Sequence, residues 1–393
     1  MTCIAIIGVP RTTYSLVESI VHARLRGIDV VLVDIQSVLK KTAGWLPLKR
    51  KLPVPALDLH SVVEALTPIQ PHFVVSFTEF NMVLAAEVRE RLCLSGLSPR
   101  VEERVRHKDK TRARLAETGL THIQFETCTL AQLNSTVRHF EPPFVIKPIN
   151  LTGSVGVCAI RNHKDISMFP QYFVDFDKER SRDRSFLIED FIDGTEYSVE
   201  GISLNGCFHM LALTKKYTNG FPNFAEIGHI LPGRTLSKET YYSEFIQRVV
   251  TSLEIGTAPI HAEVIESSHA LELVEIHTRF AGDLIPLLME RAFEYKVFGM
   301  YYDALMFGQV PKTNAPALIS GIRFLDRNTV KQLREIPLQA SNISYDITVN
   351  QAANTESEPS LDNIRIQNHR CGHIVFQVTN HDDAEHVMLS FSS

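Results

Sequence analysis

Two glutamates near the middle of the chain have the spacing expected of a divalent-metal site. Glu263 and Glu275 fall within residues 261–283, where polar and apolar side chains alternate in two runs and predict two antiparallel strands. With a tight turn at Ser267–His269, Glu263 lies opposite Leu273 and diagonally from Glu275, at about 7–8 Å. Carboxylates so placed can hold Mg²⁺, or Mn²⁺ as an alternative, together with phosphate oxygens.

The pairing register decides whether these two carboxylates meet. A turn longer by one residue would pair Glu263 with Val274 and send the glutamates to opposite faces of the hairpin. Two solvated strand glutamates are therefore the competing interpretation. Arg279, two residues beyond the second strand, would add a cation suited to phosphate or to a developing oxyanion.

The composition is that of an ordinary globular protein. Of its 393 residues, 44% are hydrophobic and 22% charged, so we expect two or three domains with a sizeable core. A net charge of −5 gives no overall attraction to nucleic acid or to an anionic membrane. Six dispersed cysteines, the lack of a basic leader and the lack of a long apolar run predict a reduced, cytoplasmic chain with no membrane partner. A homodimer is left open.

The N-terminal region predicts a small doubly wound domain that ends near residue 98. Apolar runs alternate with segments of helical spacing, as in a parallel sheet. The predicted elements are strands at 3–9, 30–34 and 73–76 and helices at 16–26, 61–66 and 83–92. A dinucleotide-binding fold is the alternative, but the turn at 8–11 lacks the second and third glycines of that fingerprint and contains Pro10.

Basic residues crowd the segment 104–114. A nucleic-acid patch is one interpretation, but acidic residues interrupt the run and no aromatic residues are interleaved for base stacking. The preferred interpretation is a solvated helix start with one or two lysines directed at phosphate.

A glycine-containing loop follows a strand that carries Lys147. Residues 144–157 place this lysine before Gly153 and Gly156, which differs from the Walker order. Glycines let backbone N–H groups turn towards phosphate oxygens, while the lysine supplies a positive charge beneath them. The segment predicts a phosphate-covering flap, with a simple hairpin as the alternative.

Two further carboxylates bracket an apolar connector. Glu189 and Glu196 flank a segment whose free backbone groups could read the edge of an adenine, and Glu196 could accept hydrogen bonds from ribose hydroxyls. Asn205-Gly206 predicts a two-residue hairpin turn. Residues 215–236, which include Glu226 and His229, are expected to form a long functional loop.

The remainder of the chain is predicted to be helical and then β-rich. The expected helices lie at 238–253, 285–293 and 298–307, and the β-rich region begins near residue 311. It includes a polar, exposed segment at 350–360 and a strand at 372–378.

In this order the motifs resemble the ATP-grasp superfamily, over nearly the whole chain. The resemblance implies a multidomain α/β and α+β protein: an ATP-grasp fold with an N-terminal doubly wound pre-ATP domain. It implies a pre-ATP domain at 1–98, a grasp domain at 99–310 and a β-rich C-terminal subdomain at 311–393. Within the grasp domain, 122–190 would form the flap subdomain and 191–310 the metal and substrate subdomain.

The resemblance also implies ATP and Mg²⁺ as cofactors and assigns residues to them. Lys110 and Lys147 would contact the phosphates, and the flap would include Gly153, Ser154 and Gly156. The adenine would meet Glu189, Phe191 and Ile192, and the ribose Glu196. The metal would lie on Glu263, Glu275 and His277.

Within the superfamily, Phe224-Ala-Glu-Ile-Gly-His229 and Glu275-Ile-His-Thr-Arg-Phe-Ala-Gly282 resemble the L-amino acid ligases, the dipeptide-forming group that includes the bacilysin-type enzyme. This implies an ADP-forming carboxylate–amine ligase with an acyl phosphate intermediate and amino acids as substrates. Glu226, His229, Arg279 and Asp283 would form the substrate site, and Arg279, Lys147 and Glu275 would act in catalysis. The alternatives are a ligase for a non-amino-acid carboxylate and a nucleotide-binding protein without turnover.

Asp283 has two interpretations. It follows Arg279 by four residues in a glycine-containing turn, and so could line the pocket for the first amino acid. Asp is also a preferred capping residue for the helix predicted from Ile285.

Overall fold

The computed structural model describes most of the chain. The described residues are 2–10, 13–42, 46, 48, 50–151, 153, 156–169, 185–221, 224–232, 238–313, 315–326, 329–330, 343–349 and 370–390. Two sequence predictions, on Ser154 and on the segment 350–360, lie outside these residues.

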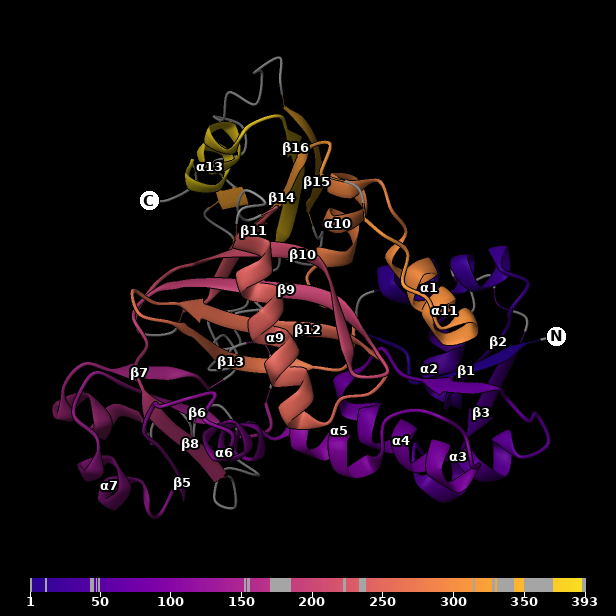
Figure 1. The fold of residues 1–393 in the computed structure, drawn as a ribbon, viewed down its shortest axis with the longest axis horizontal. Helices are drawn as coiled ribbons and strands as arrows, with labels where there is room; N and C mark the ends of the chain where they lie inside the picture. The colour runs from indigo at the N-terminus through magenta and orange to yellow at the C-terminus, as the bar shows by residue number, and fades with distance from the viewer. Residues whose placement is uncertain are drawn as a thin grey trace.

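The N-terminal region is a parallel sheet of four strands with helices packed on it (Figure 1). All five residues of its first strand are buried, as a strand covered on both faces requires. The predicted strand–helix–strand unit is confirmed, and the pair β3 and α2 was not predicted. The sheet order is β3-β2-β1-β4. The elements are β1 (Cys3–Ile7), α1 (Thr13–Leu25), β2 (Asp29–Ile35), α2 (Gln36–Lys41), β3 (Lys51–Val54), α3 (Leu59–Leu66), β4 (Phe73–Val75), η1 (Glu79–Asn81) and α4 (Met82–Arg91).

A second, antiparallel sheet of four strands carries the predicted lysine strand. Phe140, Phe144 and Phe186 lie in its own hydrophobic core, so this sheet packs largely by itself. Its order is β5-β8-β6-β7. The elements here are α5 (Pro99–Arg106), α6 (Lys108–Glu117), β5 (Phe125–Thr129), α7 (Leu133–Thr136), η2 (Val137–His139), β6 (Phe144–Pro148), β7 (Cys158–Ile160), η3 (His163–Met168) and β8 (Ser185–Asp190).

The largest sheet has eight strands in the order β13-β12-β9-β10-β11-β14-β16-β15. Helix α9 covers one of its faces (Figure 1), where Tyr197, Val199 and Val264 pack in one core with Tyr242 and Ile246 of the helix. The elements are β9 (Thr195–Leu204), β10 (Cys207–Thr218), β11 (Glu226–Leu231), α9 (Glu239–Leu253), β12 (Ala258–Glu266), β13 (Leu271–His277), α10 (Ile285–Phe293), α11 (Val297–Phe307), β14 (Ile319–Leu325), β15 (Ser344–Val349), β16 (Gly372–Val378) and α13 (His381–Leu389).

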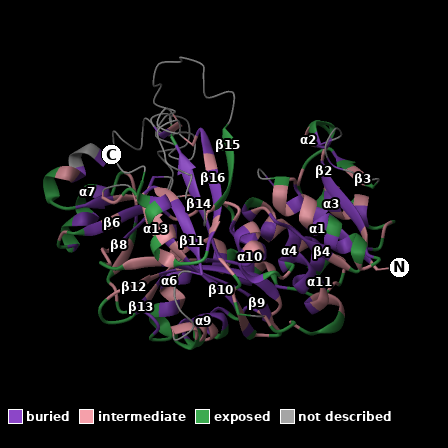
Figure 2. Ribbon diagram, turned by 90° about the horizontal axis from the view of Figure 1, so that it is seen from above, coloured by how far each residue is buried: buried purple, intermediate pink, exposed green. Residues whose placement is uncertain are grey.

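Burial follows this layered arrangement. Strands in the interior are buried, while the outer faces of the helices are exposed (Figure 2). The core that contains Ile4 and Ile6 of β1 also contains Leu288 of α10 and Phe298 of α11, so the N-terminal sheet and the helices after the β12–β13 hairpin share one apolar interior. The domain bounds given by the sequence stay a prediction.

The predicted loop at 215–236 is wrong. Strand β10 continues to Thr218, and β11 lies between β10 and β14 in the large sheet. The partner β14 is about 90 residues away in sequence, so local polarity gave no indication of this pairing. The Asn205-Gly206 turn is confirmed, with positive φ angles of 51° and 83° at its two residues.

The predicted register of the β12–β13 hairpin is also wrong. Glu266 pairs with Leu271, so the turn is longer than expected, and this alone would separate the two glutamates. A β-bulge between Glu263 and Val264 shifts the register by one residue and places Glu263 directly opposite Glu275. The expected proximity of the carboxylates is therefore present, but by a different pairing.

A second β-bulge changes the pairing of β10 with β11 in the same way. Thr218 pairs with Glu226 and Tyr217 with Gly228, which leaves Ile227 as the extra residue. In a regular strand, Glu226 and His229 would point to opposite faces because side chains alternate. The bulge brings them to one face, where their side chains lie 3.9 Å apart.

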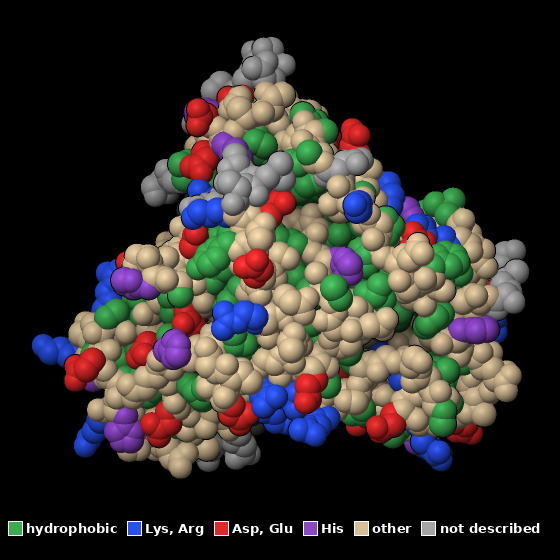
Figure 3. Space-filling view, viewed as in Figure 1, with side chains coloured by type: hydrophobic (Ala, Val, Ile, Leu, Met, Phe, Trp, Pro, Cys, Tyr) green, Lys and Arg blue, Asp and Glu red, His purple; other side chains and the backbone are tan. Residues whose placement is uncertain are grey.

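The described helices include none that could cross a membrane by length and apolarity. On the face shown in Figure 3, acidic and basic side chains are interspersed.

Candidate active site

A cavity of about 400 Å³ lies between the β6–β8 sheet and the large sheet. Its volume is within the range of small-molecule sites. One part of its wall is apolar, with Val145, Phe191, Ile192, Phe224 and Ile265. Another part is charged, with Lys108, Lys147, Lys216 and the glutamates of the hairpin. Such a cavity can hold a ligand with an apolar ring at one end and anionic groups at the other.

The charged wall is one face of the large sheet. Residues 196, 198 and 200 alternate along β9 with the apolar residues that face α9. Glu263 and His261 of β12 pair directly with Ser198 and Glu200, and so share their face. The β13 partners Glu275 and His277 extend this face by one strand. One face of the sheet is therefore built for packing and the other for polar chemistry.

Lys216 lies at the centre of this face. Its Nζ is 2.6 Å from Glu196, 2.7 Å from Glu226 and 2.8 Å from Glu263. Burial opposes its charge, but the three carboxylates outweigh burial and raise the pKa of Lys216 well above its ordinary value. The sequence analysis missed Lys216, although a charged residue in a β-run otherwise rich in apolar side chains could have indicated it.

Two histidines bracket the hairpin glutamates. The rings of His261 and His277 stack at 5.6 Å. His261 Nδ1 lies 2.7 Å from Glu200, and its Nε2 lies 3.4 Å from Glu263. Burial alone would lower the pKa of His261, but Glu200 and Glu263 outweigh burial and raise it to about 10.

His277, expected as a metal ligand, lies between two carboxylates. Its Nε2 is 3.1 Å from Glu275 and its Nδ1 is 3.4 Å from Glu79. Both ring nitrogens therefore face protein carboxylates. The oxygens of Glu263 and Glu275 form the hard donor set that Mg²⁺ prefers, so this part of the site fits a magnesium ion.

Lys110, expected at the phosphates, is outside the cavity. Its side chain is 47% exposed and pairs with Glu103 at 3.1 Å. Lys108 lines the cavity instead, with Nζ 2.6 Å from Glu275 and 2.8 Å from the carbonyl oxygen of Leu151. Helix α6 begins at Lys108, and two residues of helix turn the side-chain direction by about 200°. The two lysines therefore point to different sides.

Lys147 does line the cavity, as expected, but it is paired. Its Nζ contacts Glu189, which also accepts from Arg112 at 3.0 Å. Burial lowers the pKa of Lys147, and Glu189 offsets only part of this effect. Glu189, expected at the edge of an adenine, is thus engaged in a buried ion-pair group. Phe191 and Ile192 line the cavity beside it.

The flap glycines have the conformation that glycine permits. Gly153 and Gly156 have φ angles of 65° and 75°, in the left-handed region. Gly153 lines the large cavity and also a second cavity of about 110 Å³.

The second cavity contains the remaining predicted substrate residues. It shares Lys216, Glu226, Glu263 and Glu275 with the first cavity. Its other lining residues include His229, Arg279 and Asp283. Arg279 donates to Glu79 at 2.8 Å and to the carbonyl of Phe280 at 3.0 Å. The two cavities are therefore adjoining spaces around one set of carboxylates.

Asp283 does not cap the helix that follows it. The N-cap of α10 is Leu284, and no side chain caps it. The Asp283 carboxylate accepts from Arg370 at 2.7 Å and lies 3.7 Å from His229. The structure thus favours the pocket interpretation. Arg370, which the sequence analysis missed, also lies 3.5 Å above the ring of Phe324.

His229 is the least satisfied group of this cavity. It is 1% exposed, and neither ring nitrogen has a hydrogen-bond partner among the described residues. The ligand atoms of Glu226, His229 and Asp283 all lie within 4.8 Å of one another. A polar group placed between them would relieve the cost of leaving the imidazole unpaired.

Comparison with known proteins gives the same picture of the fold. Residues 140–286 match the family model of the ATP-grasp domain. The alanine–anticapsin ligase of Bacillus subtilis is 25% identical over 275 residues, which are 63% of this chain and 57% of that protein. The dapdiamide A synthase of Enterobacter agglomerans is 27% identical over 173 residues, 43% of this chain and 40% of that protein. The matched part of the chain thus spans 57% of the length of the first relative and 40% of the length of the second.

Two solved structures are similar over nearly all of the chain. The L-amino acid ligase of Bacillus licheniformis superposes with a TM-score of 0.76 at 18% identity, covering 100% of this chain and 97% of that one. An N5-carboxyaminoimidazole ribonucleotide synthetase in complex with ADP gives 0.72 at 14% identity, covering 99% and 96%. At these identities the similarity concerns the fold.

We expect the stability contributed by His261 to fall as pH rises. Its pKa is about 10 in the folded protein and about 6.5 when unfolded. The contribution is fully present below the unfolded value and is lost as pH rises through the folded one. We therefore expect the difference in the free energy of unfolding between wild type and His261→Gln to become smaller from about pH 6 through pH 8 to pH 10, as measured by urea unfolding.

His60→Gln is the control, because the side chain of His60 is 91% exposed and touches only an exposed glutamate. A gap for His261→Gln that stays constant over this range would show that His261 is not held as an imidazolium.

Proposed function

We propose that this chain, which carries an ATP-grasp domain and adopts the ATP-grasp fold, is an ADP-forming carboxylate–amine ligase that joins two amino acids. ATP phosphorylates the carboxylate of the first amino acid. The amine of the second then displaces phosphate from the acyl phosphate. This chemistry needs no side-chain nucleophile and depends on positioning and on charge stabilisation.

The observation that supports the proposal most directly is the shared charged wall of two adjoining cavities. The larger cavity has an apolar part and two lysines, Lys108 and Lys147, which suits a nucleotide. In the smaller cavity His229 lies between two carboxylates, and neither of its ring nitrogens has a hydrogen-bond partner among the described residues, which suits a substrate amine or another polar group. Glu263 and Glu275 belong to both cavities, at the place where a phosphoryl group would pass from one to the other.

Each group has a proposed role. Adenine lies against Phe191 and Ile192, with the ribose near Glu196. Lys108 and Lys147 bind phosphate oxygens beneath the flap at Gly153 and Gly156. Glu263 and Glu275 would hold the divalent cation, which when bound neutralises phosphate charge. These placements follow the cavity lining, and Lys108 replaces Lys110 of the sequence prediction.

The amino-acid site is proposed for the smaller cavity. Glu226, His229 and Asp283 would receive the first amino acid. Arg279, held by Glu79, would face the charge that develops on the reacting carboxylate. The relatives named alanine–anticapsin ligase and L-amino acid ligase support amino acids as the substrate class.

The decisive experiment measures nucleotide products with pools of L-amino acids. We expect ADP and phosphate release that depends on amino acids and on a divalent cation, with a dipeptide as the other product. Glu275→Gln should lose most of this activity because it removes one of the two cation-binding carboxylates. Release of AMP and pyrophosphate would reject the mechanism.

Other outcomes of the same experiment separate the alternatives. ADP release that requires a keto or dicarboxylic acid, with no response to amino acids, would indicate a ligase of another substrate class. ATP binding without any turnover across these pools would indicate a nucleotide-binding protein.

The two lysines of α6 provide a matched pair. Lys108→Gln should raise KM for ATP or lower kcat by on the order of 10²-fold or more, because a preorganised cation at the phosphates is lost. Lys110→Gln should stay within about twofold of wild type, since its side chain is half exposed outside the cavity. The reverse result would return the phosphate contact to Lys110.

Asp283 should determine which first amino acid is accepted. Asp283→Asn keeps the size but removes the charge that pairs with Arg370 at 2.7 Å. Glu226, at 3.3 Å, is then the remaining carboxylate partner of Arg370 in this pocket, which becomes less negative and better suited to an anionic side chain. We expect the accepted first substrates to shift towards acidic amino acids, measured as kcat/KM over the pool. Asp283→Trp should restrict the profile to small apolar residues. An unchanged profile in both variants would exclude Asp283 from the pocket.

A further inference from the structure

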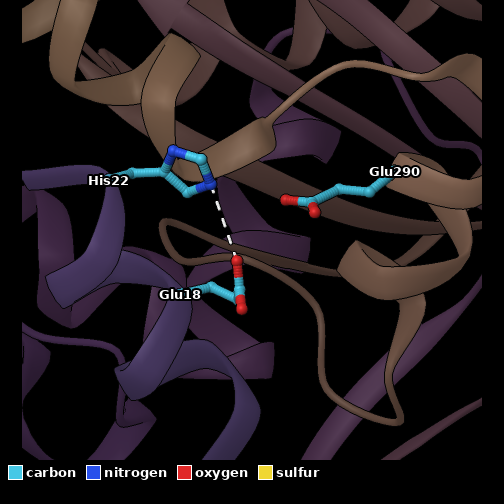
Figure 4. A group of neighbouring side chains, drawn as sticks. All are labelled: Glu18, His22 and Glu290. Atoms are coloured by element: carbon cyan, nitrogen blue, oxygen red, sulfur yellow. Dashed lines mark ion pairs between the residues drawn. The ribbon is translucent and has the colours of Figure 1, made fainter. Parts of the chain in front are cut away.

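A second group of potential metal ligands lies outside the lining of these two cavities, between α1 and α10. Glu18 and His22 are one turn apart on α1, and Glu290 comes from α10. Figure 4 shows the Glu290 carboxylate pointing towards the His22 ring and the Glu18 carboxylate. One ligand atom from each of the three residues lies within 4.8 Å of the others.

Glu290 is buried with one oxygen unsatisfied. The residue is 7% exposed, and its Oε1 has no hydrogen-bond partner in the described part of the chain. Its other oxygen accepts from the Nζ of Lys296 at 2.9 Å. Burying a carboxylate oxygen without a well-formed hydrogen bond is costly. The Glu290 carboxylate points towards His22 and Glu18, where a bound cation would lower this cost.

His22 offers the nitrogen ligand of this group. It is 5% exposed, and its Nε2 lies 3.5 Å from Glu18. Burial lowers the pKa of His22, while Glu290 and Glu18 oppose this and Arg26 and Lys296 add to it. The phenol of Tyr14 also faces Glu290. Burial, the charges of Glu290 and Glu18, and a side-chain hydrogen bond with Glu290 raise the pKa of this phenol.

We propose that Glu18, His22 and Glu290 bind a divalent transition-metal ion such as Zn²⁺. Imidazole nitrogen and carboxylate oxygen are both ligands that this class of ion accepts, and water would complete the coordination. The ammonium of Lys296 is the competitor for Glu290, and at 58% exposure its side chain can move into solvent. The proposal is independent of the ligase activity.

A metal ion bound here would link the N-terminal parallel sheet and its helices to the part of the molecule that contains the second cavity. Helix α1 belongs to the lobe built on β1 and β2, and α10 begins two residues after Asp283. The ion would therefore hold the helix that follows the second cavity against the first helix of the chain. Its expected effect is on stability and on the position of α10, with no part in the chemical step.

The test measures binding of Zn²⁺, and of Co²⁺ as a spectroscopic probe, to the full chain by equilibrium dialysis and thermal unfolding. Wild type should bind an ion at Glu18, His22 and Glu290. Glu275→Gln should still bind this ion, because that substitution changes only the cation site at Glu263 and Glu275. His22→Gln and Glu290→Gln should weaken this binding by at least about tenfold, because even partners outside the ligand shell are worth about 10–100-fold. Glu18→Gln, at a more exposed ligand, should weaken it too.

Two further variants separate a metal site from a purely structural group. Lys296→Gln removes the competing ammonium and should strengthen binding, which loss of a structural ion pair would not do. His60→Gln is the matched control, because His60 and Glu64 form an exposed pair at 3.8 Å with the same one-turn spacing, and binding should be unchanged.

The proposal is overturned if wild type binds no ion beyond the one that Glu275→Gln loses. It is equally overturned if His22→Gln and Glu18→Gln bind Zn²⁺ as tightly as wild type. Weaker binding in Lys296→Gln than in wild type would also contradict it.

Discussion

The ammonium of Lys216 among three carboxylates is the interaction on which the site depends. Glu196, Glu226 and Glu263 come from three different strands and would repel one another if left alone. Buried carboxylates are tolerated only when they are paired, and one lysine here contacts all three within 2.8 Å. Because Lys216 lies on β10, between β9 and β11, this contact fixes the polar face across the strands that form the charged wall.

From this centre the ion pairs extend to the N-terminal lobe. His277 contacts Glu275 on one side and Glu79 on the other, and Arg279 also donates to Glu79. Glu79 follows the strand β4 of the N-terminal sheet. The lobe therefore supplies a carboxylate that orients both the histidine and the arginine of the hairpin. Such an arrangement holds the guanidinium of Arg279 in place, which favours preorganised charge stabilisation.

The lysines and the glutamates of the charged wall already have protein partners of opposite sign. Lys108 pairs with Glu275, and Lys147 with Glu189. A nucleotide with its metal ion carries both signs, so phosphates could take over the lysines while the cation takes over the carboxylates. Exchange of this kind gives each buried charged group a partner of opposite sign before and after binding, and so avoids an unpaired ion in a region of low dielectric. It also gives a reason why one wall serves both cavities.

The sequence by itself determined the strand with Lys147, the hairpin with Glu263 and Glu275, and the N-terminal strand–helix–strand unit, because alternation, helical period and glycine placement are local properties.

Only the tertiary structure decided the register, since the β-bulge that sets Glu263 opposite Glu275 depends on pairing with neighbouring strands. It likewise decided that Glu226 and His229 share a face of β11 and that Lys216 lies between carboxylates from other strands. The choice of Lys108 over Lys110 required knowing where α6 begins, because each residue turns a helix by about 100°. Contacts between distant segments, such as Asp283 with Arg370, leave no periodic trace in a sequence and follow only from packing.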